Sequence, residues 1–174
     1  MLMRTEVETQ SNAGALAAGT IAAIGAATLG GAWFFQYVLS IEPCPMCLEQ
    51  RFAYYLVIVL GAVLAFSAPR LPRTVVIAAL AIMALAAFAN SIYGAFHAGI
   101  EWGFWPGPAA CSGPVQDLGS AGTLLQRLDT VRVVRCDEVQ WRFLGLSLAG
   151  YNFLISGLMG LVALFGINRL RTAG

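Results

Sequence analysis

Four long stretches without a charged residue constrain the fold of this 174-residue chain more than any other feature. They are Thr9–Ile41, Phe52–Ala68, Thr74–Ile100 and Phe143–Asn168, of 33, 17, 27 and 26 residues. A helix needs about 17–25 mostly apolar residues to cross a bilayer core of about 30 Å. Because backbone polar groups in lipid must be satisfied within their own segment, helices are the expected elements. The stretches therefore predict four transmembrane helices.

The composition supports a membrane protein. Hydrophobic residues make up 59% of the chain and charged residues only 11%, with a mean hydropathy of +0.74. A soluble domain has about 25% charged residues, which is more than twice the fraction here. A disordered chain has low hydrophobicity and high charge, so this class is excluded as well. The net charge of +1 gives no electrostatic reason to expect nucleic acid as a partner.

We expect an all-α integral membrane protein, a four-transmembrane-helix bundle that forms one domain over residues 1–174. The expected spans are about 14–39, 52–68, 74–97 and 145–167, with links at 40–51 and 98–143. The apolar run of the first span is longer than that of a cleaved signal peptide, so we expect this span to be retained. Ala and Gly within the spans favour close helix packing. Apolar residues and arginines recur at helical spacing within 124–135. This pattern predicts either an amphipathic helix on the membrane surface or a short helix in solvent.

An even number of spans puts both termini on one side of the membrane and both links on the other. All four cysteines lie in the links. The arginines are denser on the side of the termini, which mildly favours cytoplasmic termini. Disulfides persist outside the cytosol, which favours the same orientation. In a bacterium this predicts an inner-membrane protein with periplasmic links.

The cysteines form two pairs, Cys44-x-x-Cys47 in the first link and Cys111 with Cys136 in the second. Four cysteines are enough for a zinc site, but the second pair lacks the spacing of a zinc knuckle, so we expect no metal. The pairs are then either static structural disulfides or partners in thiol–disulfide exchange. Exchange is favoured because Cys47 lies near a helix N-terminus, where a thiolate is stabilised.

Two ionisable residues share the membrane depth of Cys47. Arg51 follows it by one helical turn on the same face, where it favours a thiolate or a bound anion. Alternatively, Arg51 extends its charge to the membrane interface, as arginines at helix ends often do. His97, the only histidine, ends the third span. It is either a functional group within the membrane or a side chain hydrated at the headgroup level.

Net oxidation of thiols needs an acceptor for two electrons. The chain has no glycine-rich nucleotide-binding motif, and its single histidine cannot supply two haem ligands. A quinone, as a lipid-soluble acceptor of two electrons, suits a site in the bundle near Cys47, Arg51 and His97. We therefore expect a quinone, with Arg51 and His97 as its candidate binding residues.

Two segments resemble the DsbB family of disulfide-generating membrane proteins. They are Pro43–Arg51 (PCPMCLEQR), which opens the second span, and Gln140–Leu146 (QWRFLGL), which leads into the fourth. The four spans, the two cysteine pairs and the histidine ending span three also fit this family. The Pro-Met between the cysteines and Gln50 before the arginine depart mildly from its pattern. Neither departure is expected to touch a group that the family mechanism requires.

The resemblance implies a protein-dithiol:quinone oxidoreductase that generates disulfides de novo. A reduced thioredoxin-fold oxidase of the DsbA type would attack a Cys111–Cys136 disulfide, with Cys111 forming the mixed disulfide. Cys136 would then exchange with Cys44, and Cys47 would pass two electrons to ubiquinone or menaquinone.

The resemblance also makes Arg51 and His97 neighbours of the quinone. One alternative is a four-span membrane protein with static disulfides. Another is the vitamin K epoxide reductase type, in which we expect the quinone-side cysteine pair late in the bundle. Here that pair precedes the second span.

Overall fold

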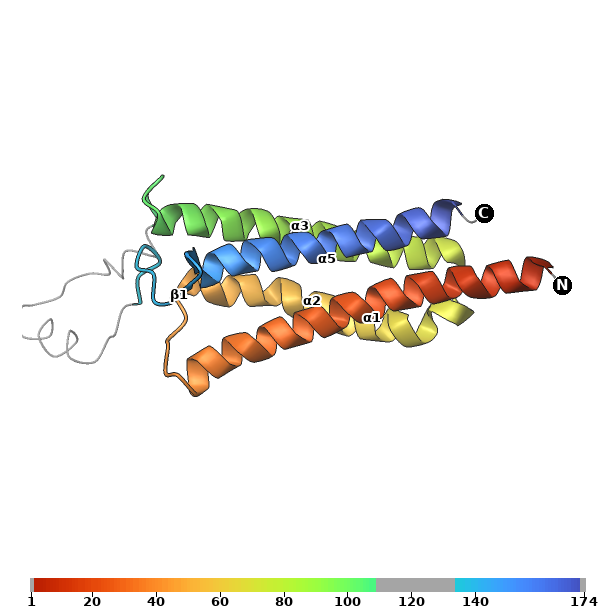
Figure 1. Ribbon diagram of the computed structural model, residues 1–174, viewed down its shortest axis with the longest axis horizontal. Coiled ribbons are helices and arrows are strands. Elements are labelled where there is room, and N and C mark those ends of the chain that lie inside the picture. Colours follow the sequence, from red (N-terminus) through yellow and green to blue (C-terminus); the bar gives the residue numbers. More distant parts are fainter. Residues whose placement is uncertain (1, 109–133, 173–174) are drawn as a thin grey trace, which may run out of the picture.

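A computed structural model describes residues 2–108 and 134–172 and shows four long helices (Figure 1). They are α1 (Leu2–Tyr37), α2 (Pro45–Ser67), α3 (Arg73–Glu101) and α5 (Leu148–Thr172). Each is long and apolar enough to cross a membrane. The predicted all-α architecture of four spanning helices is thus confirmed. The helix expected within 124–135 falls largely outside the described residues.

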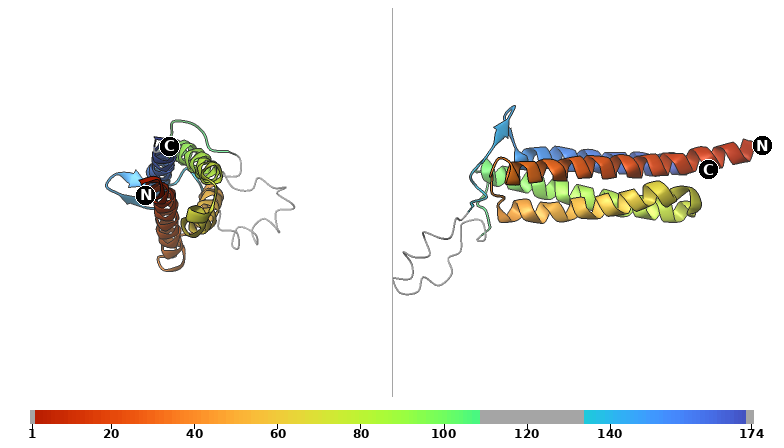
Figure 2. Two further views of the ribbon diagram at one scale, coloured as in Figure 1. Left: turned by 90° about the vertical axis from the view of Figure 1, so that its right-hand side faces the viewer. Right: turned by 90° about the horizontal axis from the view of Figure 1, so that it is seen from below.

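The four helices form a ring in the order α1, α2, α3, α5, which Figure 2 shows end-on. Each helix packs mainly against its two neighbours in the ring, and α3 and α5 share the largest contact. The chain termini and the turn η1 (Ala68–Arg70) lie at one end of the bundle (Figure 1). The α1–α2 connection, the end of α3 and the start of α5 lie at the other. Both cysteine-bearing links therefore meet the bundle at the same end.

Helix α2 begins at Pro45, whereas its span was expected from residue 52. Cys44 is the N-cap residue, and proline is favoured at the first helical position because its missing N–H has no partner there anyway. The charged residues Glu49 and Arg51, which end the uncharged stretch, project from the exposed or half-exposed side of this first part of the helix. The Cys-x-x-Cys pair thus belongs to the first turn of α2 instead of a flexible link.

Small residues bring the helices close together, as their composition predicts. A Cβ atom on Gly61 would lie 2.8 Å from the Ala18 carbonyl oxygen, and one on Gly166 would lie 2.7 Å from the Ala17 Cβ. Helix α1 therefore approaches both α2 and α5 too closely for larger side chains. Many large apolar side chains point outward instead, as expected in lipid. The most exposed among them include Phe66, Leu85 and Ile92.

A short hairpin precedes α5 and was not predicted from the sequence. Its strands, β1 (Arg142–Phe143) and β2 (Leu146–Ser147), pair antiparallel. The turn residues Leu144 and Gly145 have φ values of 49° and 83°, the positive values that a tight two-residue turn requires. Because of this hairpin, α5 begins at Leu148, although its span was expected from residue 145.

Candidate redox site

The N-terminus of α2 brings the two sulfur atoms of the Cys-x-x-Cys pair together. As the N-cap residue, Cys44 accepts a hydrogen bond on its Sγ from the Cys47 backbone N–H, at 3.3 Å. The two Sγ atoms lie 3.0 Å apart, and both cysteines are free thiols. A disulfide bond is about 2.05 Å long, so the pair can close and open with little backbone movement.

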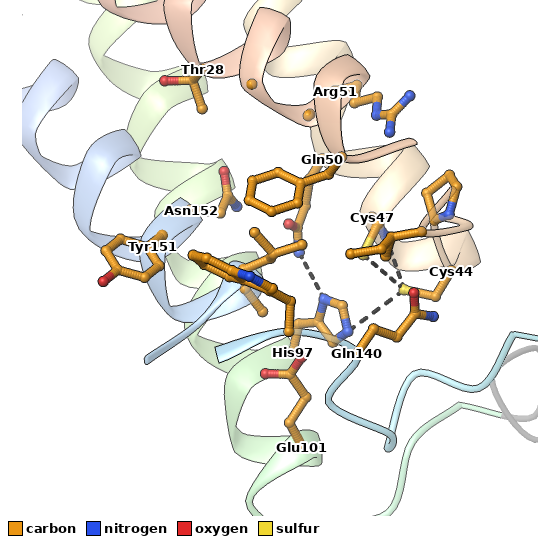
Figure 3. Close-up of a pocket in the computed structure, with 18 of the residues that line it drawn as sticks. Thr28, Cys44, Cys47, Gln50, Arg51, His97, Glu101, Gln140, Tyr151 and Asn152 are labelled. Carbon is orange, nitrogen blue, oxygen red and sulfur yellow. Dashed lines mark hydrogen bonds between the residues drawn. The ribbon is translucent and has the colours of Figure 1, made fainter. Parts of the chain in front are cut away.

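His97 reaches this pair from α3. Its side chain is only 2% exposed, with Nε2 3.6 Å from Cys44 Sγ and Nδ1 3.2 Å from Gln50 Nε2 (Figure 3). Contacts at both ring nitrogens hold the imidazole in one orientation. Such burial argues against a histidine hydrated at the headgroup level. We call Cys44, Cys47 and His97 the cysteine–histidine cluster.

The surroundings of Cys44 favour its thiolate. The hydrogen bond from the Cys47 thiol is the main cause that lowers the pKa of Cys44 from 9.0 to about 5. Burial of the sulfur opposes this effect, and the hydrogen bond and charge of His97 add to it. From the sequence, we expected the helix N-terminus to stabilise a thiolate at Cys47. In the structure, which has both cysteines as thiols, Cys44 is the residue that occupies the N-cap position and contacts His97.

Cys136, from the second pair, packs against the first pair. It is 1% exposed and shares a buried cluster with Cys44, against which Cys47 also packs. Cys136 is disulfide-bonded, and its backbone interacts with His97. Cys111 lies outside the described residues. Three of the four cysteines singled out from the sequence therefore meet around one histidine.

A cavity of about 380 Å³ opens beside the cysteine–histidine cluster and is lined by residues of all four helices (Figure 3). This volume lies in the usual range for small-molecule sites, about 300–1,000 Å³. Arg51 lines the cavity, and its Nη1 donates a hydrogen bond to Gln36 Oε1 of α1 at 2.7 Å. The cluster and Arg51 are thus brought to one cavity, with Arg51 held from the α1 side.

A buried polar network deeper in the bundle contributes to the cavity wall. Asn152 Oδ1 accepts hydrogen bonds from Tyr54 Oη at 2.6 Å, Asn90 Nδ2 at 3.1 Å and Ser156 Oγ at 3.3 Å. These donors fix the orientation of the Asn152 amide. Its Nδ2 is buried and has no hydrogen-bond partner among the described residues, although Asn152 lines the cavity. A buried donor without a partner is costly, so this atom suits a ligand that supplies an acceptor.

Among the polar residues of the cavity wall that sequence reasoning missed are Gln50, Glu101 and Asn152. Gln50 was not expected to touch a group that the family mechanism requires, and its buried side chain contacts His97, a candidate binding residue for the quinone. Glu101 accepts a hydrogen bond from Ser147 Oγ and so joins α3 to the hairpin. A search for polar residues inside spans would have found Asn152, because such residues are often functional.

The fold and the site define a multi-pass membrane protein that carries a Cys-x-x-Cys pair at one end of a four-helix bundle. A family model described as "Disulfide bond formation protein DsbB" matches residues 14–166. The chain belongs to this family of four-helix membrane proteins, as the PCPMCLEQR and QWRFLGL segments predicted.

Several curated relatives named "Disulfide bond formation protein B" are similar to the chain. The relative from Azoarcus sp. (strain BH72) is 31% identical over 142 residues, which cover 80% of this chain and 84% of the relative. The relative from Polaromonas sp. (strain JS666) is 29% identical over 139 residues, covering 79% and 80%. The relative from Marinobacter nauticus is 30% identical over 159 residues, covering 84% and 88%. No solved structure is a significant match.

Proposed function

We propose that the protein is a protein-dithiol:quinone oxidoreductase that generates disulfides de novo. It reoxidises a periplasmic thioredoxin-fold oxidase of the DsbA type and passes two electrons through its cysteine pairs to a membrane quinone. One observation carries this proposal: Cys136 packs against the Cys44–Cys47 pair beside a cavity with a buried, unpaired donor. The name of the family, disulfide bond formation protein, supports the same chemistry.

The first half of the reaction is thiol–disulfide exchange. A thiolate of the partner attacks the disulfide that we assign to Cys111 and Cys136, and the second partner thiol releases its own disulfide. The reduced Cys136 then attacks Cys44 of the oxidised Cys44–Cys47 disulfide, and Cys47 leaves as a thiolate. Cys111 next attacks Cys136, which restores the Cys111–Cys136 disulfide and releases Cys44, so that the Cys44–Cys47 pair is left as a dithiol. Cys136 and Cys44 belong to one buried cluster, which supports the attack of Cys136 on Cys44, since exchange needs the attacking sulfur close to its target. His97 lies beside both residues and is placed to accept or return a proton.

The residues of the cavity fit a quinone headgroup. Such a headgroup is flat, apolar and carries two carbonyl oxygens, each of which accepts hydrogen bonds. The cavity offers a charged donor in Arg51 and a buried, unpaired donor in Asn152 Nδ2, within a mainly apolar wall. A quinone bound there would take up the two electrons and two protons that the Cys44–Cys47 dithiol releases. His97, at 3.6 Å from Cys44 Sγ, lines the same wall.

We place the protein in the bacterial inner membrane with cytoplasmic termini. The links at residues 40–51 and 98–143 then face the periplasm, where a soluble thiol oxidase reaches them. The greater arginine density near the termini supports this orientation. Membrane lipid is a partner on the outward faces of the helices, where large apolar side chains are exposed.

The test avoids the soluble partner. The purified protein, with all four cysteines reduced and oxygen removed, receives a soluble quinone analogue, and quinone absorbance and free thiols are followed together. We expect one quinone consumed for every two thiols lost, with no reaction in Cys44→Ala or Cys47→Ala. Thiols that stay reduced beside unreacted quinone would contradict the proposal. That result would favour static disulfides.

A further inference from the structure

The cysteine–histidine cluster has the composition and spacing of a metal site. The Sγ atoms of Cys44 and Cys47 and a ring nitrogen of His97 all lie within 4.8 Å of one another. These atoms come from α3 and the N-terminus of α2. The packing of two helices therefore brings them together, and they do not belong to a single flexible loop. Two thiolates and an imidazole are ligands that Zn²⁺ prefers.

The distances can be compared with those of a tetrahedral zinc centre. Zn–S bonds of about 2.3 Å and Zn–N bonds of about 2.0–2.1 Å imply an S···N separation of about 3.6 Å and an S···S separation of about 3.8 Å. The separation of Cys44 Sγ from His97 Nε2 is 3.6 Å and already matches. The two Sγ atoms, 3.0 Å apart, need to separate by less than 1 Å. Since Cys47 is half-buried in the first turn of α2, a rotation of its side chain supplies this movement.

Gln50 orients the histidine ligand. Its side-chain amide lies 3.2 Å from His97 Nδ1 and is buried. Histidines that bind metals usually donate the N–H of their other ring nitrogen to a carbonyl or carboxylate oxygen. With the Gln50 amide turned so that Oε1 faces Nδ1, the Nδ1–H donates to it. Nε2 then presents its lone pair to the sulfur atoms.

We propose that the reduced cysteine–histidine cluster binds one thiophilic d¹⁰ metal ion, typified by Zn²⁺, and that oxidation of the cysteine pair abolishes the site. Binding displaces whatever protons the two sulfur atoms still carry and changes no oxidation state. Closing the Cys44–Cys47 disulfide removes both thiolate ligands, so binding and thiol oxidation exclude each other. Three protein ligands leave one coordination position open toward the cavity, which all three line.

This inference goes beyond electron transfer to quinone and does not depend on it. A bound ion blocks formation of the Cys44–Cys47 disulfide, because both sulfur atoms are then bonded to the metal. The reduced protein therefore becomes a metal-inhibited state, and its oxidised state is insensitive to the metal. The thiols that make the pair reactive are thus the same groups that bind the metal ion.

The experiment uses the full-length, tag-free protein in detergent without quinone. Reduced protein is titrated anaerobically with Co²⁺, a coloured probe for tetrahedral zinc sites, and then with Zn²⁺ as competitor. We expect one Co²⁺ per chain, with thiolate-to-cobalt charge transfer and tetrahedral d–d bands that Zn²⁺ removes. Disulfide-oxidised protein gives neither signal. Reduced protein that binds no cobalt, or oxidised protein that binds it equally well, would overturn the inference.

Variants assign the ligands. Cys44→Ser, Cys47→Ser and His97→Ala each weaken binding by at least about tenfold, and the double variant Cys111→Ser/Cys136→Ser binds as the wild type does. Loss of binding in that double variant would place the ion on the other cysteine pair and refute the proposed site. An unchanged affinity in His97→Ala would refute the histidine ligand.

Gln50→Leu tests the orientation of the histidine without removing a ligand. We expect affinity to fall by about 10- to 100-fold while one ion still binds. Gel-filtration profiles confirm that each variant stays folded. An unchanged affinity in Gln50→Leu would contradict the part assigned to the buried amide.

Discussion

Three influences meet at Cys44: the N-cap geometry of α2, the thiol of Cys47 and the ring of His97. Each stabilises negative charge on the sulfur, and together they outweigh the cost of burial. In the reduced pair, these contacts therefore favour a thiolate at Cys44. Cys136 lies in the same buried cluster as Cys44.

The pH dependence of the reduced pair tests this view. Because the pKa of Cys44 is lowered to about 5, its thiolate should persist down to about pH 5 and be protonated below it. The stability that comes from this shift is full above about pH 9 and is lost as pH falls from there through about 5. Thiolate absorbance, measured in the Cys111→Ser/Cys136→Ser background, gives the midpoint. Cys47→Ala should raise it most and His97→Ala less, whereas a wild-type midpoint near 9 would contradict the prediction.

Arg51 is a charged donor in the cavity wall. Arg51→Ala should raise the KM for a quinone analogue by about 10- to 100-fold, because a hydrogen bond to a charged group contributes about 1.5–3 kcal/mol. The matched control is Arg70→Ala, which removes an exposed arginine at the opposite end of the bundle and should leave KM unchanged. Steady-state quinone reduction measures both variants. A wild-type KM in Arg51→Ala would make this residue an anchor at the membrane interface only.

At the scale of the helices, α3 and α5 share the most extensive contact. A Cβ on Gly94 would lie 2.9 Å from the Phe153 backbone nitrogen and 2.8 Å from Asn152 Nδ2. The polar network of Asn152 crosses the same interface through Asn90. The glycine and the network thus fix the distance between the two helices, and with it the position of the buried donor beside the cavity.

Gly94→Ala should therefore destabilise the bundle. Overpacking of a close contact costs about 1–3 kcal/mol, and here the neighbour is backbone, which cannot move aside easily. Gly30→Ala is the control, because a Cβ there meets no atom within 4 Å. Unfolding in mixed detergents compares the two variants with the wild type. Equal stability of all three would show that α3 and α5 tolerate a wider separation.

The helices themselves were predictable because a bilayer demands long uncharged stretches, but their ends and polar contacts were not. Glu49 and Arg51 come just before the uncharged stretch although they lie within α2. A span defined by the absence of charge therefore starts later than the helix does. The N-cap and proline signals at Cys44 and Pro45 mark the true start. The network around Asn152 escaped because amides carry no charge, and its partners come together only in the tertiary structure.

At the scale of the whole molecule, the reactive groups gather at one end of a bundle whose outer faces are apolar. Figure 1 shows the hairpin strand β1 and the start of α2 at this end and both termini at the opposite end. The cavity, which the cysteine–histidine cluster lines, includes residues of the hairpin and of the start of α2. In the proposed function, electrons from a soluble partner would therefore reach a membrane-soluble acceptor without crossing the bilayer. That function requires the cluster to lie on the side of the membrane where the soluble partner is.

Labelling of single cysteines in intact bacterial cells tests this orientation. In a variant with all four native cysteines changed to serine, Phe104→Cys should react with a membrane-impermeant maleimide, because this exposed residue follows α3 at the cluster end. Leu71→Cys, next to the η1 turn at the other end, should react only after the inner membrane is permeabilised. The reverse pattern would put the cysteines in the cytoplasm. There, reducing conditions oppose stable disulfides, and a periplasmic oxidase could not be the electron donor.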